Sequence, residues 1–173
     1  MTCVAGVARG GHVCIGGDSS IAWDEESLDS CVEPKVFRRG EWLIGLAGDA
    51  NADRAFHFEL RPPQVTKPIR RLVAVDFADE VKRALETTGA GEADFSALIG
   101  VSGQLYVMGS TYEVARHRWG YAAVGSGAAW ATGALAILTD GGSLTLQQTI
   151  TEALDAAHRH CPGVRPPFAY VSA

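Results

Sequence analysis

The sequence has few cysteines, and none is spaced as in a metal-binding or redox motif. The four cysteines stand at positions 3, 14, 31 and 161, so no CxxC motif is present. The N-terminus also lacks the basic segment and continuous apolar run of a secretory signal. Both absences argue against a secreted, disulfide-stabilised protein and favour the cytoplasm, with the cysteines as free thiols.

A concentration of positive charge is missing as well. The formal net charge is -5, and charged residues make up 20% of the chain. A protein that binds nucleic acid needs a concentrated basic surface, because it must neutralise phosphates. We interpret the basic pairs Arg38-Arg39 and Arg70-Arg71 as solvated turns. The sequence therefore predicts no nucleic-acid partner.

A long, strongly hydrophobic run is absent too. Residues 119–139 carry no charge, and a segment of that length could cross a bilayer. Glycine and alanine dominate it, however, and the residues that favour membrane insertion strongly are only Val124, Leu135, Ile137 and Leu138. We predict a strand, a turn at Gly125-Ser126-Gly127 and a deeply buried helix over residues 128–138, with no membrane segment.

Several segments alternate apolar and polar residues or are apolar on both faces, and both patterns predict a protein rich in strands. Hydrophobic residues make up 47% of the 173 residues, which suits one globular domain over residues 1–173. Apolar residues on both faces of Cys3 to Ala8 are typical of a central strand, and Gly10-Gly11 predicts a hairpin with His12 to Asp18. Further antiparallel strands are predicted over residues 35–38, 41–47, 95–101, 104–109, 112–116, up to 124, and 168–171.

Helical periodicity occupies the remaining segments. One helix is predicted from a cap at Asp49 to Pro62-Pro63, a second after Ile69, and two more over residues 128–138 and 146–159. Residues 19–34 are acidic and without a period, so we predict a loop that lines a pocket or a subunit contact. This order of elements predicts an α+β fold in which helices cover two stacked, largely antiparallel sheets.

Three residues near the start carry the chemistry. Thr2 becomes the first residue if the initiator methionine is removed. A threonine with a free amine holds its own base, since the amine can take the hydroxyl proton while the oxygen attacks a carbonyl. Asp18 ends the second predicted strand and Lys35 opens the third. Taken alone these residues are ambiguous, because a small second residue is common and the pair also fits a strand-end salt bridge.

Five segments in one order resemble the N-terminal-nucleophile hydrolases of the proteasome β-subunit type. The likeness is greatest to the bacterial HslV peptidase and its short relatives in actinobacteria and their phages. The matching segments cover nearly the whole chain. They are Thr2 with its valine-rich strand, Gly16-Gly17-Asp18-Ser19, Pro34-Lys35-Val36-Phe37, Ile44 to Gly48 leading to Ala52-Asp53, and Gly125-Ser126-Gly127. The resemblance implies a four-layer αββα sandwich.

The resemblance also implies roles for five residues. Thr2 would be the nucleophile, the Lys35 ammonium would favour the neutral form of its amine, and Asp18 would hold Lys35 in place. The backbone N–H of Gly48 would bind the oxyanion, and Ser126 would orient the amine. Simpler interpretations exist for the last two. Tight packing explains a glycine at 48, and the backbone of a strand-to-helix turn explains Gly-Ser-Gly.

One part of the chain departs from the family pattern. The family usually carries an aspartate after its last helix and a serine three residues further on, and Arg159 and Pro162 align there. Either Asp155, one helical turn earlier, partly replaces the acid, or the site is rewired or inactive.

Taken together, the residues and the resemblance give as the leading hypothesis a threonine peptidase or amidase acting after removal of Met1. The alternatives are a non-catalytic ring or scaffold subunit and a hydrolase of small amides.

The resemblance further implies a peptide or protein substrate, a homo-oligomeric ring and an ATPase partner. The uncharged segment over residues 119–139 supports assembly, since it is hard to cover fully within 173 residues. No cofactor is implied. His158, His160 and Cys161 form a cluster of three candidate metal ligands, but no second cluster has a matching spacing, so we predict no metal site.

Overall fold

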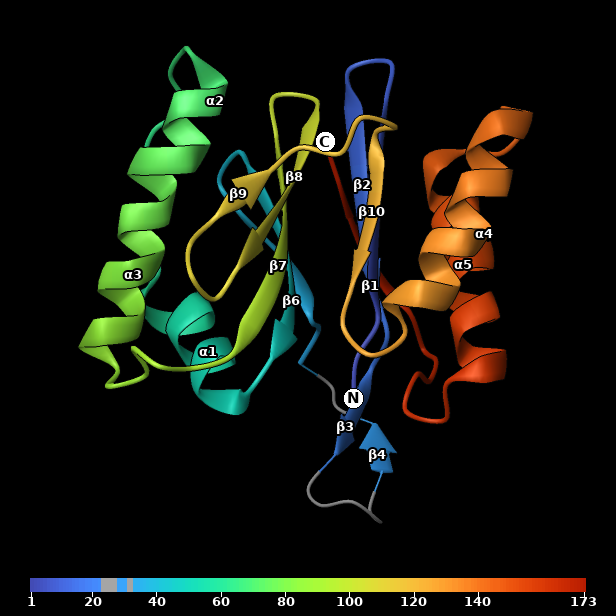
Figure 1. Ribbon diagram of the computed structural model, residues 1–173, viewed down its shortest axis with the longest axis horizontal. Coiled ribbons are helices and arrows are strands. Elements are labelled where there is room, and N and C mark those ends of the chain that lie inside the picture. Colours follow the sequence, from blue (N-terminus) through green and yellow to red (C-terminus); the bar gives the residue numbers. More distant parts are fainter. Residues whose placement is uncertain (23–27, 31–32) are drawn as a thin grey trace.

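Two stacked antiparallel sheets form the centre of the molecule, and a layer of helices covers each outer face (Figure 1). The computed structural model describes residues 1–22, 28–30 and 33–173. One helical layer comes from the middle of the chain and the other from its last third, as the colours in Figure 1 show. The predicted α+β class and the four-layer αββα arrangement are confirmed.

The first sheet has the strand order β10-β1-β2-β11. Its strands are β1 (Val4–Arg9), β2 (His12–Gly17), β10 (Tyr121–Val124) and β11 (Ala169–Ser172). The predicted hairpin at Gly10-Gly11 is confirmed, and β1 lies between two partners. In its register Val4 faces both Gly17 and Val124. The residues just before β1, just after β2 and just after β10 must therefore meet at one end of the sheet.

The second sheet has the strand order β5-β6-β7-β8-β9. Its strands are β5 (Val36–Arg39), β6 (Trp42–Gly48), β7 (Phe95–Val101), β8 (Gln104–Gly109) and β9 (Val114–Ala115). All were predicted, although β9 is shorter than expected. Gly48 at the end of β6 faces Phe95 at the start of β7.

The middle helical layer differs from its prediction in one respect. It consists of α1 (Ala50–Arg54), η1 (Ala55–Glu59), α2 (Ile69–Arg71), η2 (Leu72–Phe77) and α3 (Ala78–Thr87). Asp49 caps α1 as predicted, accepting from the backbone N–H groups of Asn51 and Ala52 at 2.9 and 3.0 Å. The segments η1 and η2 are π-helical, with wider turns than a periodicity of 3.6 residues assumes.

The second helical layer holds α4 (Ala128–Gly141) and α5 (Leu146–His160). The prediction that the first of these helices is deeply buried is wrong. Only Ala131 and Leu135 of α4 are fully buried, whereas Trp130 and Ile137 are 49% and 76% exposed. The helix packs one face against α5 and β10, and within the described chain its other apolar face stays open. In α5, the buried residues are Thr149, Ile150, Ala153, Leu154 and Ala157.

The segment after Asp18 is more ordered than the predicted loop. Ser20–Ala22 (β3) and Leu28–Ser30 (β4) pair as a short antiparallel ribbon. Residues 23–27 and 31–32 of the predicted loop, including Cys31, lie outside the described residues. None of the described helices is long and apolar enough to cross a membrane.

Candidate active site

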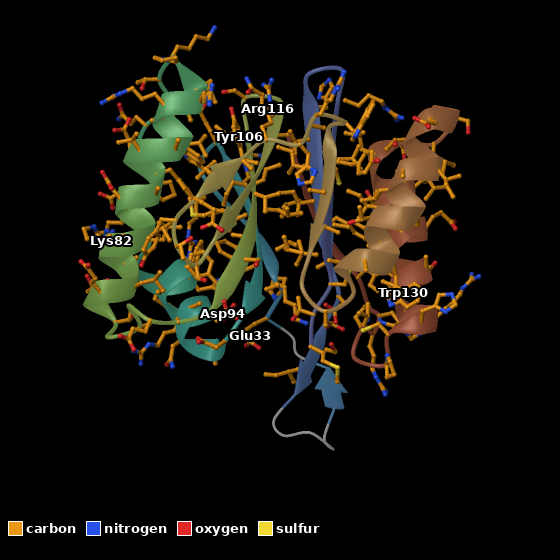
Figure 2. The ribbon with its side chains drawn as sticks, in the orientation of Figure 1. Glu33, Lys82, Asp94, Tyr106, Arg116 and Trp130 are labelled. Atoms are coloured by element: carbon orange, nitrogen blue, oxygen red, sulfur yellow. The ribbon has the colours of Figure 1, made fainter. Side chains whose placement is uncertain are left out.

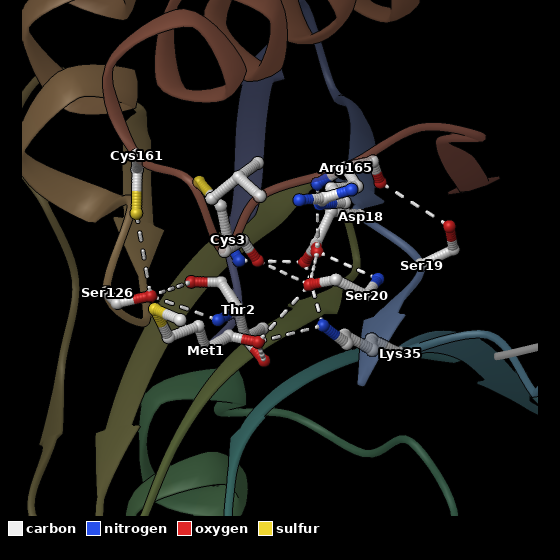
Figure 3. Close-up of polar contacts among 12 residues, drawn as sticks. Met1, Thr2, Cys3, Asp18, Ser19, Ser20, Lys35, Ser126, Cys161 and Arg165 are labelled. Carbon is white, nitrogen blue, oxygen red and sulfur yellow. Dashed lines mark hydrogen bonds and ion pairs between the residues drawn. The ribbon is translucent and has the colours of Figure 1, made fainter. Parts of the chain in front are cut away.

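Residues far apart in the sequence meet at the end of the sheets where the N-terminus lies (Figure 3). Thr2 precedes β1, Asp18 follows β2, Lys35 precedes β5 and Ser126 follows β10. The strand registers bring them there, since each stands one or two residues beyond a strand end. Four of the five predicted site residues thus belong to one network of hydrogen bonds.

Ser126 holds the main chain of Thr2 from both sides. Its hydroxyl oxygen accepts from the N–H of Thr2 at 3.0 Å and donates to the carbonyl oxygen of Thr2 at 3.2 Å. The preceding Gly125 has a φ of 92°, and a Cβ atom there would collide with the Thr2 carbonyl. Glycine is therefore required at 125 for this close approach.

The Asp18 carboxylate is buried and accepts hydrogen bonds at both oxygens. Oδ1 accepts from Lys35 Nζ at 2.9 Å and from the N–H of Cys3 at 2.8 Å. Oδ2 accepts from the hydroxyl and the N–H of Ser20 at 2.6 and 3.0 Å, and from the N–H of Arg165 at 3.4 Å. A buried carboxylate is tolerated only when it is paired and hydrogen-bonded in this way.

The carbonyl oxygen of Met1 is the point on which the reactive groups converge. It accepts from Thr2 Oγ1 at 2.8 Å and from Lys35 Nζ at 3.3 Å. The threonine hydroxyl and the lysine ammonium therefore lie within hydrogen-bond reach of one atom. Loss of Met1 would release both donors, and the ammonium would then act on the new amine of Thr2 through space.

Gly48 lines a cavity of about 210 Å³ together with Thr2 and Ser126. A Cβ atom on Gly48 would lie 2.5 Å from the Asp94 carbonyl oxygen and 2.8 Å from Phe95 Cα. The packing of β6 on β7 thus requires a glycine, whatever its N–H does. The oxyanion role of Gly48 stays a prediction.

Ser20 is a member of the network that the sequence analysis missed. Besides its bonds to Asp18, its hydroxyl is hydrogen-bonded to the Gly163 carbonyl and lies 3.5 Å from the Met1 carbonyl oxygen. It thereby joins the C-terminal segment to the carboxylate that holds Lys35. An available signal was the spacing Asp-x-Ser, since an aspartate side chain commonly accepts from the backbone two residues on.

The positions that depart from the family pattern take no part in this network. Burial, and after it the Asp155 carboxylate, raises the pKa of Tyr170, so Asp155 acts on β11. Among the described residues, neither Asp155 nor Arg159 makes a hydrogen bond to Thr2. The carbonyl of Pro162 accepts from Arg165 Nε at 3.3 Å. The hypothesis that Asp155 replaces the family acid therefore has no contact to support it.

The candidate metal ligands near the end of α5 face three different neighbours. His158 Nδ1 lies 2.6 Å from the Val164 carbonyl oxygen, His160 stacks on Trp130, and Cys161 Sγ lies 3.9 Å from Ser126 Oγ. In the part of the chain that the structure describes, no group of three His, Cys, Asp or Glu residues could hold a metal ion.

A second, larger cavity of about 530 Å³ lies away from this network. Its walls come from the β5–β6 turn and from residues 57–64, and include Trp42. Trp42 begins β6 and Gly48 ends it, so the two cavities lie at opposite ends of one strand. Size alone would favour the larger cavity, but the converging hydroxyl, ammonium and carboxylate identify the smaller one as the candidate active site.

Comparisons with solved structures identify the fold. No family model matches the sequence. The chain superposes on eukaryotic HslV from Trypanosoma brucei with a TM-score of 0.81 at 18% identity, over 99% of this chain and 98% of that one. It superposes on BPH from Thiobacillus denitrificans, in complex with epoxomicin, with a TM-score of 0.80 at 19% identity, over 99% and 98% of the two chains.

A more distant likeness is to Anbu, the ancestral β-subunit, from Yersinia bercovieri. The TM-score is 0.68 at 13% identity, over 99% of this chain and 81% of that chain. The chain therefore has the N-terminal-nucleophile hydrolase fold of HslV and proteasome-like proteins. At these identities the likeness is one of fold, and activity has to be argued from the site.

Cys3 is predicted to be inert although it adjoins Thr2. Burial, followed by the Asp18 carboxylate, raises its pKa to about 12, so only about 10⁻⁴ of the thiol is ionised at about pH 8. Iodoacetamide should leave Cys3 unmodified in the folded protein and alkylate it in urea. Peptide mass spectrometry checks this, and rapid alkylation of native Cys3 would contradict the burial that we describe.

Ser20→Ala is predicted to destabilise the protein by about 1.5–3 kcal/mol, because it removes a hydrogen bond to a buried charged acceptor. Urea unfolding measures the change. The matched control is Ser19→Ala, since Ser19 Oγ makes only a 3.4 Å contact with the Arg165 carbonyl. Equal losses in the two variants would show that the bond to Asp18 contributes nothing specific.

Proposed function

We propose that the protein is a threonine-type N-terminal-nucleophile hydrolase, which cleaves amide bonds of peptides through an acyl-enzyme on Thr2 after Met1 is removed. The observation that carries the proposal is the convergence at Thr2. Its hydroxyl shares an acceptor with Lys35 Nζ, and its nitrogen is held by Ser126. Thr2 and Ser126, the proposed nucleophile and the group that orients its base, thus line one cavity, and Lys35 contacts the Met1 carbonyl oxygen beside them.

The geometry suits the following steps. The free amine of Thr2 takes the proton from Oγ1, which attacks the substrate carbonyl. The Lys35 ammonium keeps this amine neutral and therefore basic, and Asp18 fixes the ammonium. Ser126 orients the amine, and the N–H of Gly48 stabilises the oxyanion. The protonated amine then gives its proton to the leaving amine, and water hydrolyses the ester on Thr2.

Met1 decides whether this chemistry can begin. While Met1 is attached, the nitrogen of Thr2 is an amide, which donates to Ser126 and has no basicity. The Met1 carbonyl also accepts from the Thr2 hydroxyl. The chain with Met1 is therefore the inactive form in this mechanism. Removal of one residue both creates the base and frees the nucleophile.

The competing function is a non-catalytic ring or scaffold subunit with the same fold. Arg159 and Pro162, which stand where the family pattern has an acid and a serine, favour it. The Asp18–Lys35 pair does not separate the two hypotheses, because it would also stabilise a scaffold. Reactivity at Thr2 does separate them. Reaction with acyl amides but not with peptides would instead indicate a hydrolase of small amides.

Covalent labelling tests the nucleophile directly. Epoxomicin is a suitable probe, since BPH with the same fold has been solved in complex with it. We expect Met1-free protein to be labelled at Thr2, Thr2→Ala to remain unlabelled, and Lys35→Ala to react on the order of 10² times more slowly. Intact-mass spectrometry follows the reaction.

The control for the lysine is Lys82→Ala, which removes an exposed lysine on α3. Its labelling rate should match that of the unsubstituted protein. Labelling of Thr2→Ala at the same rate would disprove the assignment of the nucleophile. An unchanged rate in Lys35→Ala would leave that lysine a structural role only.

The proposal includes assembly into a closed homo-oligomeric ring in the cytoplasm, with an ATPase as a further partner. The support within the chain is the open apolar face of α4, which carries Trp130 and Ile137. A face of this kind on a soluble protein favours association, and closed symmetric assemblies are the usual result.

Light scattering at micromolar concentration should therefore show a species several times larger than the 18.3 kDa chain. Ile137→Lys should shift it towards the monomer, because a charge would be buried at the contact. Thr87→Lys adds the same charge to an exposed position in the other helical layer and should change nothing. A monomer in all three samples would rule out this assembly.

A further inference from the structure

We propose that the cavity beside Thr2 selects peptides that carry a lysine or arginine next to the scissile amide, with Asp94 as the residue that recognises the cation. This inference rests on the proposed function and names its substrate class. It starts from the charge of the cavity wall, which the nucleophile and its supporting residues do not explain.

Small and apolar groups make up most of that wall. The cavity of about 210 Å³ is lined by Met1, Thr2, Ala47, Gly48, Asp94, Phe95, Ser96, Gly125 and Ser126. In this lining, drawn from the described residues, Asp94 is the one ionisable side chain. Ala47 and Phe95 offer apolar contact to a methylene stem, while Asp94 offers a negative charge to its end. Lysine and arginine side chains combine these two features.

The segment that carries Asp94 is fixed by its neighbours. Ser110 Oγ donates to Asp94 Oδ1 at 3.2 Å. The N–H of Asp94 donates to Asp49 Oδ2 at 3.2 Å, and the N–H of Asp49 donates to the Asp94 carbonyl at 3.1 Å. This reciprocal bonding places a second carboxylate, that of Asp49, against the backbone N–H of Asp94. A fixed carboxylate recognises a cation at a smaller entropic cost than a mobile one.

A third carboxylate lies next to a strand residue that is paired with the cavity wall. The Glu113 carboxylate lies over the Cα of Gly109, where a Cβ atom would meet it, and Gly109 faces Ser96 across β7 and β8. Directly opposed residues of paired strands project to the same side of a sheet. The hydroxyl of Thr111, which donates to Glu113, lowers the pKa of this carboxyl, so it stays ionised.

The nearby positive charges do not cancel this field. Lys35 is paired with Asp18, and the Met1 ammonium departs with Met1. The guanidinium of Arg165, which donates to the neutral Pro162 carbonyl, keeps its single positive charge against the three carboxylates of Asp94, Asp49 and Glu113. Figure 2 shows Asp94 towards the end of the molecule at which Figure 1 marks the N-terminus, and Arg116 at the opposite end. The field at the cavity mouth is therefore negative, and it attracts cationic side chains.

The test compares peptide substrates that are identical except for lysine or norleucine at a position flanking the scissile amide. Norleucine has a similar stem to lysine but carries no charge. Because Asp94 is exposed, we expect a preference of roughly two- to fivefold in kcat/KM for lysine, decreasing as salt is added. Asp94→Asn keeps the oxygen that accepts from Ser110 and should abolish the preference. Asp140→Asn, at an exposed site near the end of α4, should retain it.

Binding to Thr2→Ala, measured by fluorescence anisotropy, separates this inference from the proposed function. The cation site is supported if Thr2→Ala binds the lysine peptide preferentially and the double variant Thr2→Ala with Asp94→Asn does not. This result supports the cation site even if the unsubstituted protein shows no turnover and no labelling of Thr2, an outcome that would contradict the proposed function. Cleavage with no preference for lysine, or a preference that survives Asp94→Asn, supports the function and overturns the cation site.

Discussion

The buried Asp18 carboxylate is the interaction on which the candidate site depends. It joins the start of β1 through the N–H of Cys3, the start of β5 through Lys35, the β3 ribbon through Ser20, and the C-terminal segment through Arg165. Removal of one partner from a buried ion pair typically costs about 3–5 kcal/mol, because it leaves an uncompensated charge. Four chain segments are thus held at one point, and Thr2 lies among them.

Much of the fold follows from local sequence patterns. The local features are strands with apolar residues on both faces, two glycine turns and the Asp49 cap. The strands and the cap appear where they were predicted. Three features were not predictable in the same way. The π-helical turns of η1 and η2 depend on packing, and the β3–β4 ribbon on pairing across a connection. The helix α4, which carries no charge before Asp140, proved half-open, because composition cannot tell whether the chain or a second molecule covers a face.

The candidate site divides in the same manner. Thr2, Asp18, Lys35 and Ser126 were predictable as a group, because each stands beyond the end of a strand and resembles a family motif. The bonds of Ser20 to Asp18 could have been predicted from the local spacing Asp-x-Ser, but its bond to the distant Gly163 could not. The role that we propose for Asp94 follows from its place in the cavity wall, which no local pattern encodes. Gly48 shows the converse. It was predicted for its N–H, yet the packing of β7 already requires a glycine there.

The state of Met1 in protein from its native host tests the central claim most directly. Intact-mass spectrometry before and after treatment with epoxomicin measures it in one experiment. If Thr2 is the nucleophile and its amine the base, most molecules will lack one methionine, and only these will gain the mass of the probe, on Thr2. Uniform retention of Met1, or equal labelling of molecules that retain it, would contradict the account and leave the scaffold function in its place.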